Sequence, residues 1–281
     1  MKSKSVFFGL VIILLFTFTQ SAFSWGKKGH KLINKMSVYY FPPAMKPFMK
    51  WQSYLEKHAS DADLRKKIDP SERPKHYIDI DYYKSFLEGK MIENENSLIS
   101  KYGKDVVIKE GILPWATLNT FKNLTKAFKN KNKEKALFYA ADLGHYVADA
   151  HQPMHTVMNY NGQLTGQKGI HARYEITMVN EHLKDLKKAF KFRSAPYIKN
   201  PLKFIFNYIS NSNSVCDVLF DADKLAEKEA GSTENQDYYR ILWFRTKYIT
   251  KIQFNHAAED IASLIYTAWV QGGKPSFDQM K

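Results

Sequence analysis

The chain has 281 residues, 44% of them apolar, which is enough for one substantial hydrophobic core. Its single cysteine, Cys216, excludes an internal disulfide, so the core and any bound metal ions must hold the fold together. The formal net charge of +14 favours anionic partners such as nucleic acid or phospholipid headgroups, without choosing between them.

The N-terminal segment has the pattern of a secretory signal. Lys2 and Lys4 precede an apolar run from Val6 to Leu15, and Ala22 and Ser24 place small residues three and one before a cleavage point. The run is short for a membrane anchor, and no later segment is apolar enough to span a bilayer. We therefore expect residues 1–24 to be removed, and residues 25–281 to form one secreted or periplasmic domain with a formal charge of +12 once both lysines are lost.

Helical periodicity dominates the remaining sequence. Apolar residues at helical spacing predict helices over residues 30–40, 45–55, 115–128, 134–150, 171–190, 215–230 and 238–269. Prolines predict a loop over 61–76, and several glycines predict a mobile loop over 158–170. We find no repeats and no strand-like alternation. The predicted fold is all-α, a single bundle of several helices.

Two pairs of polar residues stand out on these helices. His145 and Asp149 are the polar exceptions on an otherwise apolar helix, where polar groups need partners. Their spacing of four residues puts both on one helix face, and His171 and Glu175 repeat that spacing. His155 lies between the two pairs. Imidazoles and carboxylates clustered in this way are typical ligands of zinc, and two such pairs indicate more than one ion.

A longer motif carries a family resemblance. The segment from Leu137 to His155, the Trp25-Gly-x-x-Gly-His30 start and the His-Tyr-Ile-Asp sequence beginning at His76 resemble the superfamily of zinc-dependent phospholipases C and type I single-strand-specific nucleases. The resemblance runs from Trp25 to about Glu175. It implies an all-α hydrolase with three zinc ions, whose mature chain begins with a tryptophan that is itself a ligand.

The resemblance also implies a set of ligands for each ion. The first zinc would be bound by Trp25, through its α-amine and carbonyl, with His30 and Asp149. The second would be bound by Asp61, His76, His145 and a bridging Asp149. The third would be bound by His155, His171 and Glu175. Asp63 competes with Asp61 for the second ion. The spacing between the family's carboxylate and the next histidine favours Asp61.

Three further residue roles follow from the expected reaction. Two zinc ions can share a hydroxide and stabilise both oxygens of an in-line displacement at phosphorus. Asp61 would then be a ligand and also the general base that orients the attacking water. Arg65 would pair with phosphate through two hydrogen bonds, and Tyr77 would stack on a base.

The sequence leaves the substrate open. The His-x-x-Tyr-Glu pattern ending at Glu175, with the longer matching segment, favours a phospholipase C-type phosphodiesterase in transient contact with a membrane surface. The choline-preferring enzymes of this superfamily carry an acidic residue just after the N-terminal Trp, where this chain has Lys27 and Lys28, so the resemblance implies an anionic headgroup rather than phosphatidylcholine. The alternative is a single-strand-specific nuclease or 3′-nucleotidase, favoured by the Trp25 motif and the basic charge. A purely structural metal site would need four protein ligands, whereas the third ion has three.

Overall fold

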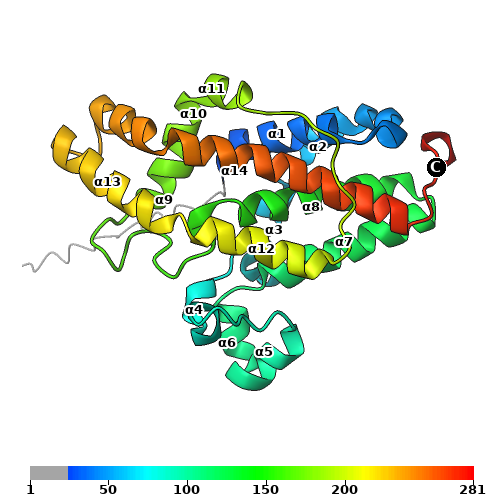
Figure 1. The fold of residues 1–281 in the computed structure, drawn as a ribbon, viewed down its shortest axis with the longest axis horizontal. Coiled ribbons are helices and arrows are strands. Elements are labelled where there is room, and N and C mark those ends of the chain that lie inside the picture. Colours follow the sequence, from blue (N-terminus) through cyan, green and yellow to red (C-terminus); the bar gives the residue numbers. More distant parts are fainter. Residues whose placement is uncertain (1–24) are drawn as a thin grey trace, which may run out of the picture.

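The computed structural model describes residues 25–281 as helices and connecting loops, with no β-strand in that range (Figure 1). The α-helices are, in chain order, α1 Gly26–Ser37, α2 Gln52–His58, α3 Asp61–Arg65, α4 Lys84–Leu87, α5 Glu95–Tyr102, α6 Lys104–Lys109, α7 Leu113–Lys129, α8 Lys133–Ala150, α9 Ile170–Ala172, α10 Val179–Glu181, α11 Leu183–Lys187, α12 Pro201–Asn213, α13 Cys216–Ala230 and α14 Gln236–Gln271. The predicted all-α fold is confirmed. The predicted leader lies outside the described residues.

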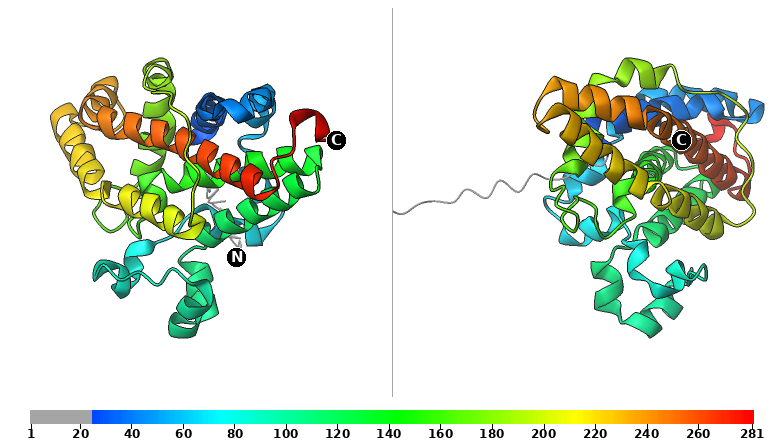
Figure 2. Two further views of the ribbon diagram at one scale, coloured as in Figure 1. Left: turned by 45° about the vertical axis from the view of Figure 1, so that its right-hand side comes forward. Right: turned by 60° about the vertical axis from the view of Figure 1, so that its left-hand side comes forward.

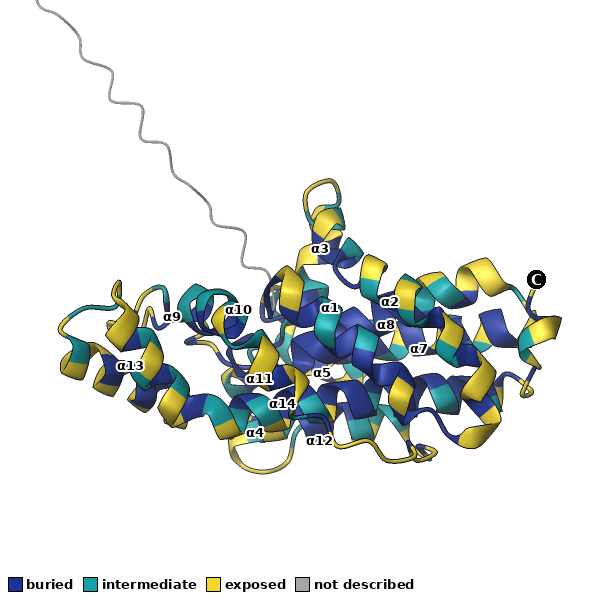
Figure 3. Ribbon diagram, turned by 90° about the horizontal axis from the view of Figure 1, so that it is seen from above, coloured by how far each residue is buried: buried dark blue, intermediate teal, exposed yellow. Residues whose placement is uncertain are grey.

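Helix α8 lies at the centre of the bundle and packs against α1, α2, α7 and α14. It begins at an Asn132 cap, whose side chain accepts a hydrogen bond from the Lys135 amide. Its C-terminal half, from Ala140 to Ala150, is buried throughout, as Figure 3 shows by its dark blue colour. Gly144 lets α1 come close, because a Cβ atom there would lie 1.9 Å from the Asn34 side-chain oxygen. The central helix therefore carries its polar residues into the interior.

The longest helix, α14, runs along one side of the bundle and packs on α13, α7 and α1. Gly231 ends α13 in a left-handed conformation with φ of 72°, which glycine adopts without strain. The chain then reverses into α14, whose first turn is capped by the Asn235 side chain. The two helices form a hairpin at one end of the molecule (Figure 2).

Three short helices, α4, α5 and α6, form a lobe that projects from the body (Figures 1 and 2). Residues 61–76, predicted as a loop, also hold short helical turns: α3 and a 3-10 helix from Pro70 to His76. No helix among residues 25–281 is both long enough and apolar enough to cross a membrane. The projecting lobe and these turns border the part of the fold that carries the histidines.

The prediction of one continuous helix over 171–190 is wrong, because several short helical segments occupy this range. The chain forms α9, then a π-helix from Arg173 to Met178, then the short helices α10 and α11. A π-helical turn widens the helix by one residue, and such turns occur frequently at functional sites. His171 and Glu175 lie on either side of the point where this change begins.

Candidate metal centre

Buried imidazole and carboxylate groups converge at three places among the described residues. The three groups are His30 with His145 and Asp149, Asp63 with His76 and His145, and His155 with His171 and Glu175. Within each group the potential ligand atoms lie within 4.8 Å of one another, and every member is buried. His145 belongs to two of the groups. The structure therefore brings together the histidines that the sequence analysis selected from five separate segments.

The first group joins α1 to α8. The rings of His30 and His145 are stacked with their centroids 4.2 Å apart. His30 Nε2 lies 3.2 Å from Asp149 Oδ1, and His145 Nε2 lies 3.3 Å from Asp149 Oδ2. The spacing of four residues on α8 places His145 and Asp149 side by side, as predicted from the sequence.

Trp25 lies just before α1, and its indole is fully buried against Tyr174 and Phe254, with ring centroids 5.8 and 4.7 Å away. The next residue, Gly26, faces the π-helix, where a Cβ atom would lie 3.5 Å from the Glu175 carbonyl oxygen. The buried indole thus fixes the start of the described chain beside the helix that supplies the third group. The role of Trp25 as a ligand stays a prediction.

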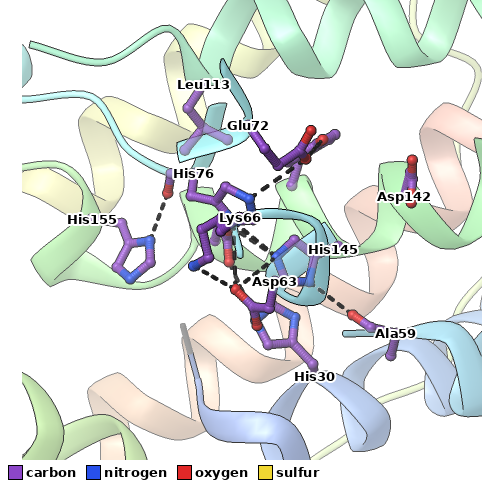
Figure 4. A network of polar contacts seen from close by, with 12 residues as sticks. His30, Ala59, Asp63, Lys66, Glu72, His76, Leu113, Asp142, His145 and His155 are labelled. Atoms are coloured by element: carbon purple, nitrogen blue, oxygen red, sulfur yellow. Dashed lines mark hydrogen bonds and ion pairs between the residues drawn. The ribbon is translucent and has the colours of Figure 1, made fainter. Parts of the chain in front are cut away.

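The second group is built around His76, at the end of the 3-10 helix Pro70–His76. His76 Nδ1 lies 2.9 Å from Asp149 Oδ2, 3.0 Å from His145 Nε2 and 3.7 Å from Asp63 Oδ1. Asp149 therefore reaches both the first and the second group, as a bridging carboxylate would. Lys66 Nζ lies 2.6 Å from Asp63 Oδ1 at the same place (Figure 4).

The choice of Asp61 over Asp63 does not match this geometry. The Asp61 side chain is 43% exposed, and its Oδ2 pairs with His58 Nδ1 at 2.7 Å. Asp63 is buried and faces His76 and His145. The physical reason is that α3 is helical: residues two apart point about 200° from each other, so only one of the two aspartates can face α8.

The third group joins the short 3-10 helix Pro153–His155 to α9 and the π-helix. His155 Nε2 and His171 Nε2 are 3.1 Å apart, and Glu175 Oε2 lies 2.9 Å from His171 Nε2 and 3.7 Å from His155 Nε2. The Gln152 side chain donates a hydrogen bond to the same carboxylate oxygen at 2.9 Å. The three side chains expected to share one ion thus point to one place.

The charges in this interior are set by mutual contact. Burial raises the pKa of Asp149, but His145 and hydrogen bonds from His145, His30 and His76 hold that pKa well below its usual value. Burial also opposes ionisation of Glu175, yet His171 and His155 lower its pKa to about 2. For His145, burial lowers the pKa, whereas Asp149 and Asp63 raise it to about 9. The neighbouring histidines therefore hold these carboxylates in the anionic form.

The unsatisfied atoms fit a metal cation. Glu175 Oε1 is buried and makes no hydrogen bond with the described residues, and His30 Nε2 and Asp149 Oδ1 are buried with only each other nearby, 3.2 Å apart. Such atoms are costly unless a cation or another partner binds them. The donors are imidazole nitrogens and carboxylate oxygens, the set that zinc prefers among common ions. These residues therefore fit zinc.

The two residues expected to contact substrate have other partners. Arg65 donates hydrogen bonds of 3.1 and 2.7 Å to the Asp142 carboxylate, so its guanidinium is engaged and a phosphate contact is not favoured. The Tyr77 hydroxyl donates to the Lys109 carbonyl at 2.7 Å, and Tyr77 is partly buried. The sequence analysis missed Tyr160, which is 47% exposed and has its ring centroid 6.1 Å from that of His171.

Comparison with known proteins identifies the family. The family model for S1/P1 nucleases matches residues 25–191, which is more than half of the chain and includes all members of the three groups. A search of curated proteins finds no match. The all-α fold is also that of this family. The chain therefore belongs to the S1/P1 nuclease family, within the superfamily that the sequence resembles, and is a hydrolase that acts on phosphodiester bonds.

Proposed function

We propose that this chain is a zinc-dependent nuclease that cleaves single-stranded nucleic acid at the three convergent groups. The observation that carries the proposal is the position of Asp149, whose two oxygens contact His30 on one side and His76 and His145 on the other. One carboxylate shared by two ligand groups is the arrangement expected for a pair of neighbouring ions. Members of this family use zinc.

Three zinc ions would be bound by the following residues: Trp25, His30 and Asp149 for the first; Asp63, His76, His145 and Asp149 for the second; and His155, His171 and Glu175 for the third. When bound, zinc would lower the pKa of a coordinated water to about 7 and polarise the phosphate. Asp63 takes the place that the sequence analysis gave to Asp61, as a ligand and as the base that orients the water.

Two observations favour a nucleic acid substrate. Tyr160 presents an exposed ring beside His171, and Tyr77, which follows His76 in the sequence, is partly exposed; aromatic rings of this kind stack on unpaired bases. The family model that matches the chain is that of the S1/P1 nucleases. We therefore rank a nuclease above the phospholipase C-type enzyme that the sequence motifs favoured, and the proposed contact with a membrane surface has no support beyond the basic charge.

The proposal includes export and processing of the chain. Cleavage after Ser24 would give Trp25 a free α-amine, which could donate a lone pair to a metal, whereas the peptide nitrogen of the precursor could not. The mature enzyme would be secreted or periplasmic, and its site would be complete only after processing.

The test compares substrates on protein that begins at Trp25. Single-stranded DNA, double-stranded DNA and anionic phospholipid vesicles are incubated with the zinc-loaded protein and with the chelated protein. We expect chelator-sensitive release of nucleotides, faster from the single strand than from the duplex. Chelator-sensitive release of phosphorylated headgroup without nucleotide release would replace this proposal with the phospholipase C-type reaction.

A further inference from the structure

Each histidine of the convergent groups has one ring nitrogen that points away from its group. The partner of this outer nitrogen differs from one histidine to another. His145 Nδ1 lies 2.8 Å from the Ala59 carbonyl oxygen, and His155 Nδ1 lies 2.6 Å from the His76 carbonyl oxygen. A second partner of this kind fixes the tautomer and the orientation of a metal-binding imidazole. In both rings the outer nitrogen donates to a backbone carbonyl, which leaves Nε2 to face the group.

His76 is turned the other way. Its Nδ1 faces Asp149 and His145, and its Nε2 faces Glu72 Oε1 at 3.6 Å. His76 Nε2 is buried and makes no hydrogen bond with the described residues. A buried ring N–H needs an acceptor, and the Glu72 carboxylate is the anionic group beside it. His76 therefore differs from His145 and His155 in facing a charged side chain rather than a carbonyl.

Glu72 is itself held from several sides. Its side chain is 3% exposed and precedes His76 by four residues on the same short helix. Lys75 Nζ lies 2.7 Å from Oε2, Arg65 reaches Oε1 at 3.4 Å, and the Tyr146 hydroxyl donates a short hydrogen bond to Oε1. A carboxylate with this many donors has little freedom to turn away, and it stays charged.

The same contacts tie together the segments that carry the second group. Arg65 follows Asp63 on α3 and binds both Glu72 and Asp142. Asp142 lies on α8, one turn before His145, and Figure 4 shows it to one side of the histidines. One buried network therefore connects α3, the 3-10 helix and α8.

We propose that Glu72 is a positioning residue for the metal centre: its carboxylate, 3.6 Å from His76 Nε2, attracts the proton of His76 to that nitrogen and so keeps the Nδ1 lone pair directed at the ion. A neutral imidazole carries one N–H, so an anion beside Nε2 favours the tautomer with a free Nδ1. The negative charge also makes the ring a better donor to zinc. This inference rests on the proposed zinc site and adds a residue that does not itself touch the ion.

The experiment measures zinc affinity by competition with a chelator of known affinity, on wild type and three variants. Glu72→Ala removes the acceptor, and Glu72→Gln keeps an oxygen in place but removes the charge. Glu259→Ala is the matched control, because Glu259 is also buried and ion-paired, with Arg193, but belongs to none of the three groups. Circular dichroism and thermal melts of the metal-free proteins report whether each variant folds.

We expect Glu72→Ala to lose about 10–100-fold in affinity for one of the bound ions. Glu72→Gln should lose less, and Glu259→Ala should bind zinc like wild type. If Glu72→Ala does not fold, the comparison of Glu72→Gln with Glu259→Ala carries the test. Wild-type affinity in both Glu72 variants, or an equal loss in Glu259→Ala, would overturn the inference while leaving the proposed function intact. A wild-type protein that binds no zinc would overturn both.

Discussion

The assignment of Asp63 in place of Asp61 gives a sharp prediction, because both residues are aspartates and they lie only two positions apart in the sequence. Replacing each with asparagine keeps size and removes the charge. Asp63 is buried beside His76, His145 and Lys66, so Asp63→Asn removes an anion from the centre of the second group. Asp61→Asn removes only the partner of His58.

The expected sizes follow from these surroundings. The Asp61–His58 pair is between a quarter and a half exposed, and a surface ion pair contributes about 0–1 kcal/mol, so Asp61→Asn should leave stability and activity close to wild type. Asp63 is proposed as ligand and general base, and loss of a general base typically costs about 10²–10⁴-fold in rate. The two variants should therefore differ in activity by at least about 10²-fold.

The assay is hydrolysis of single-stranded DNA at saturating zinc, with bound zinc measured on the same samples. Asp63→Asn should be nearly inactive and should retain less zinc, whereas Asp61→Asn should match wild type in both. Equal losses in the two variants, or a larger loss in Asp61→Asn, would refute the assignment and restore the choice made from the sequence spacing.

Three further predictions address other parts of the molecule. A variant that retains one serine before Trp25 should bind less zinc and lose most of its activity, as metal analysis and the nuclease assay would show. Full activity in this variant would exclude an α-amine ligand. Gly144→Ala should destabilise the fold by about 1–3 kcal/mol in urea unfolding, because the new methyl group meets Asn34; an unchanged midpoint would contradict the close approach. Burial, with help from Glu110 and Asp81, raises the pKa of Asp79 from its ordinary 3.8 to about 8. The folded protein then holds a proton that the unfolded chain releases, so this contribution to stability is lost as pH rises from about 4 to about 8. Metal-free wild type should lose more unfolding free energy over this range than Asp79→Asn, and parallel curves would disprove the shift.

Local periodicity was sufficient for the larger helices. The predicted segments 115–128, 134–150, 215–230 and 238–269 agree with α7, α8, α13 and α14 within a few residues at each end. Asn132 and Asn235 cap the starts of α8 and α14, and Pro114 lies in the first turn of α7. The helices α4, α5 and α6 were not predicted, because they are short and packing against the body determines them. Helix α12 was also not predicted, although its apolar residues have helical spacing.

The site could be predicted where spacing alone fixes geometry. His145 with Asp149, and His171 with Glu175, are four residues apart on helical turns, and each pair meets in the structure. The choice between Asp61 and Asp63 could not be made in the same way, because it depends on how α3 is rotated against α8. The role of Glu72 could not be predicted from the sequence for the same reason, because its partners come from segments up to 74 residues away.

The central claim is that the three buried groups bind zinc and that this zinc is required to cleave single-stranded nucleic acid. The most direct measurement is the zinc content of the protein that begins at Trp25, taken with its single-stranded DNA hydrolysis before chelation, after chelation and after zinc is restored. The account predicts bound zinc, loss of hydrolysis with its removal, and recovery on its return. A chelated protein that contains no zinc and still cleaves at the original rate would contradict it.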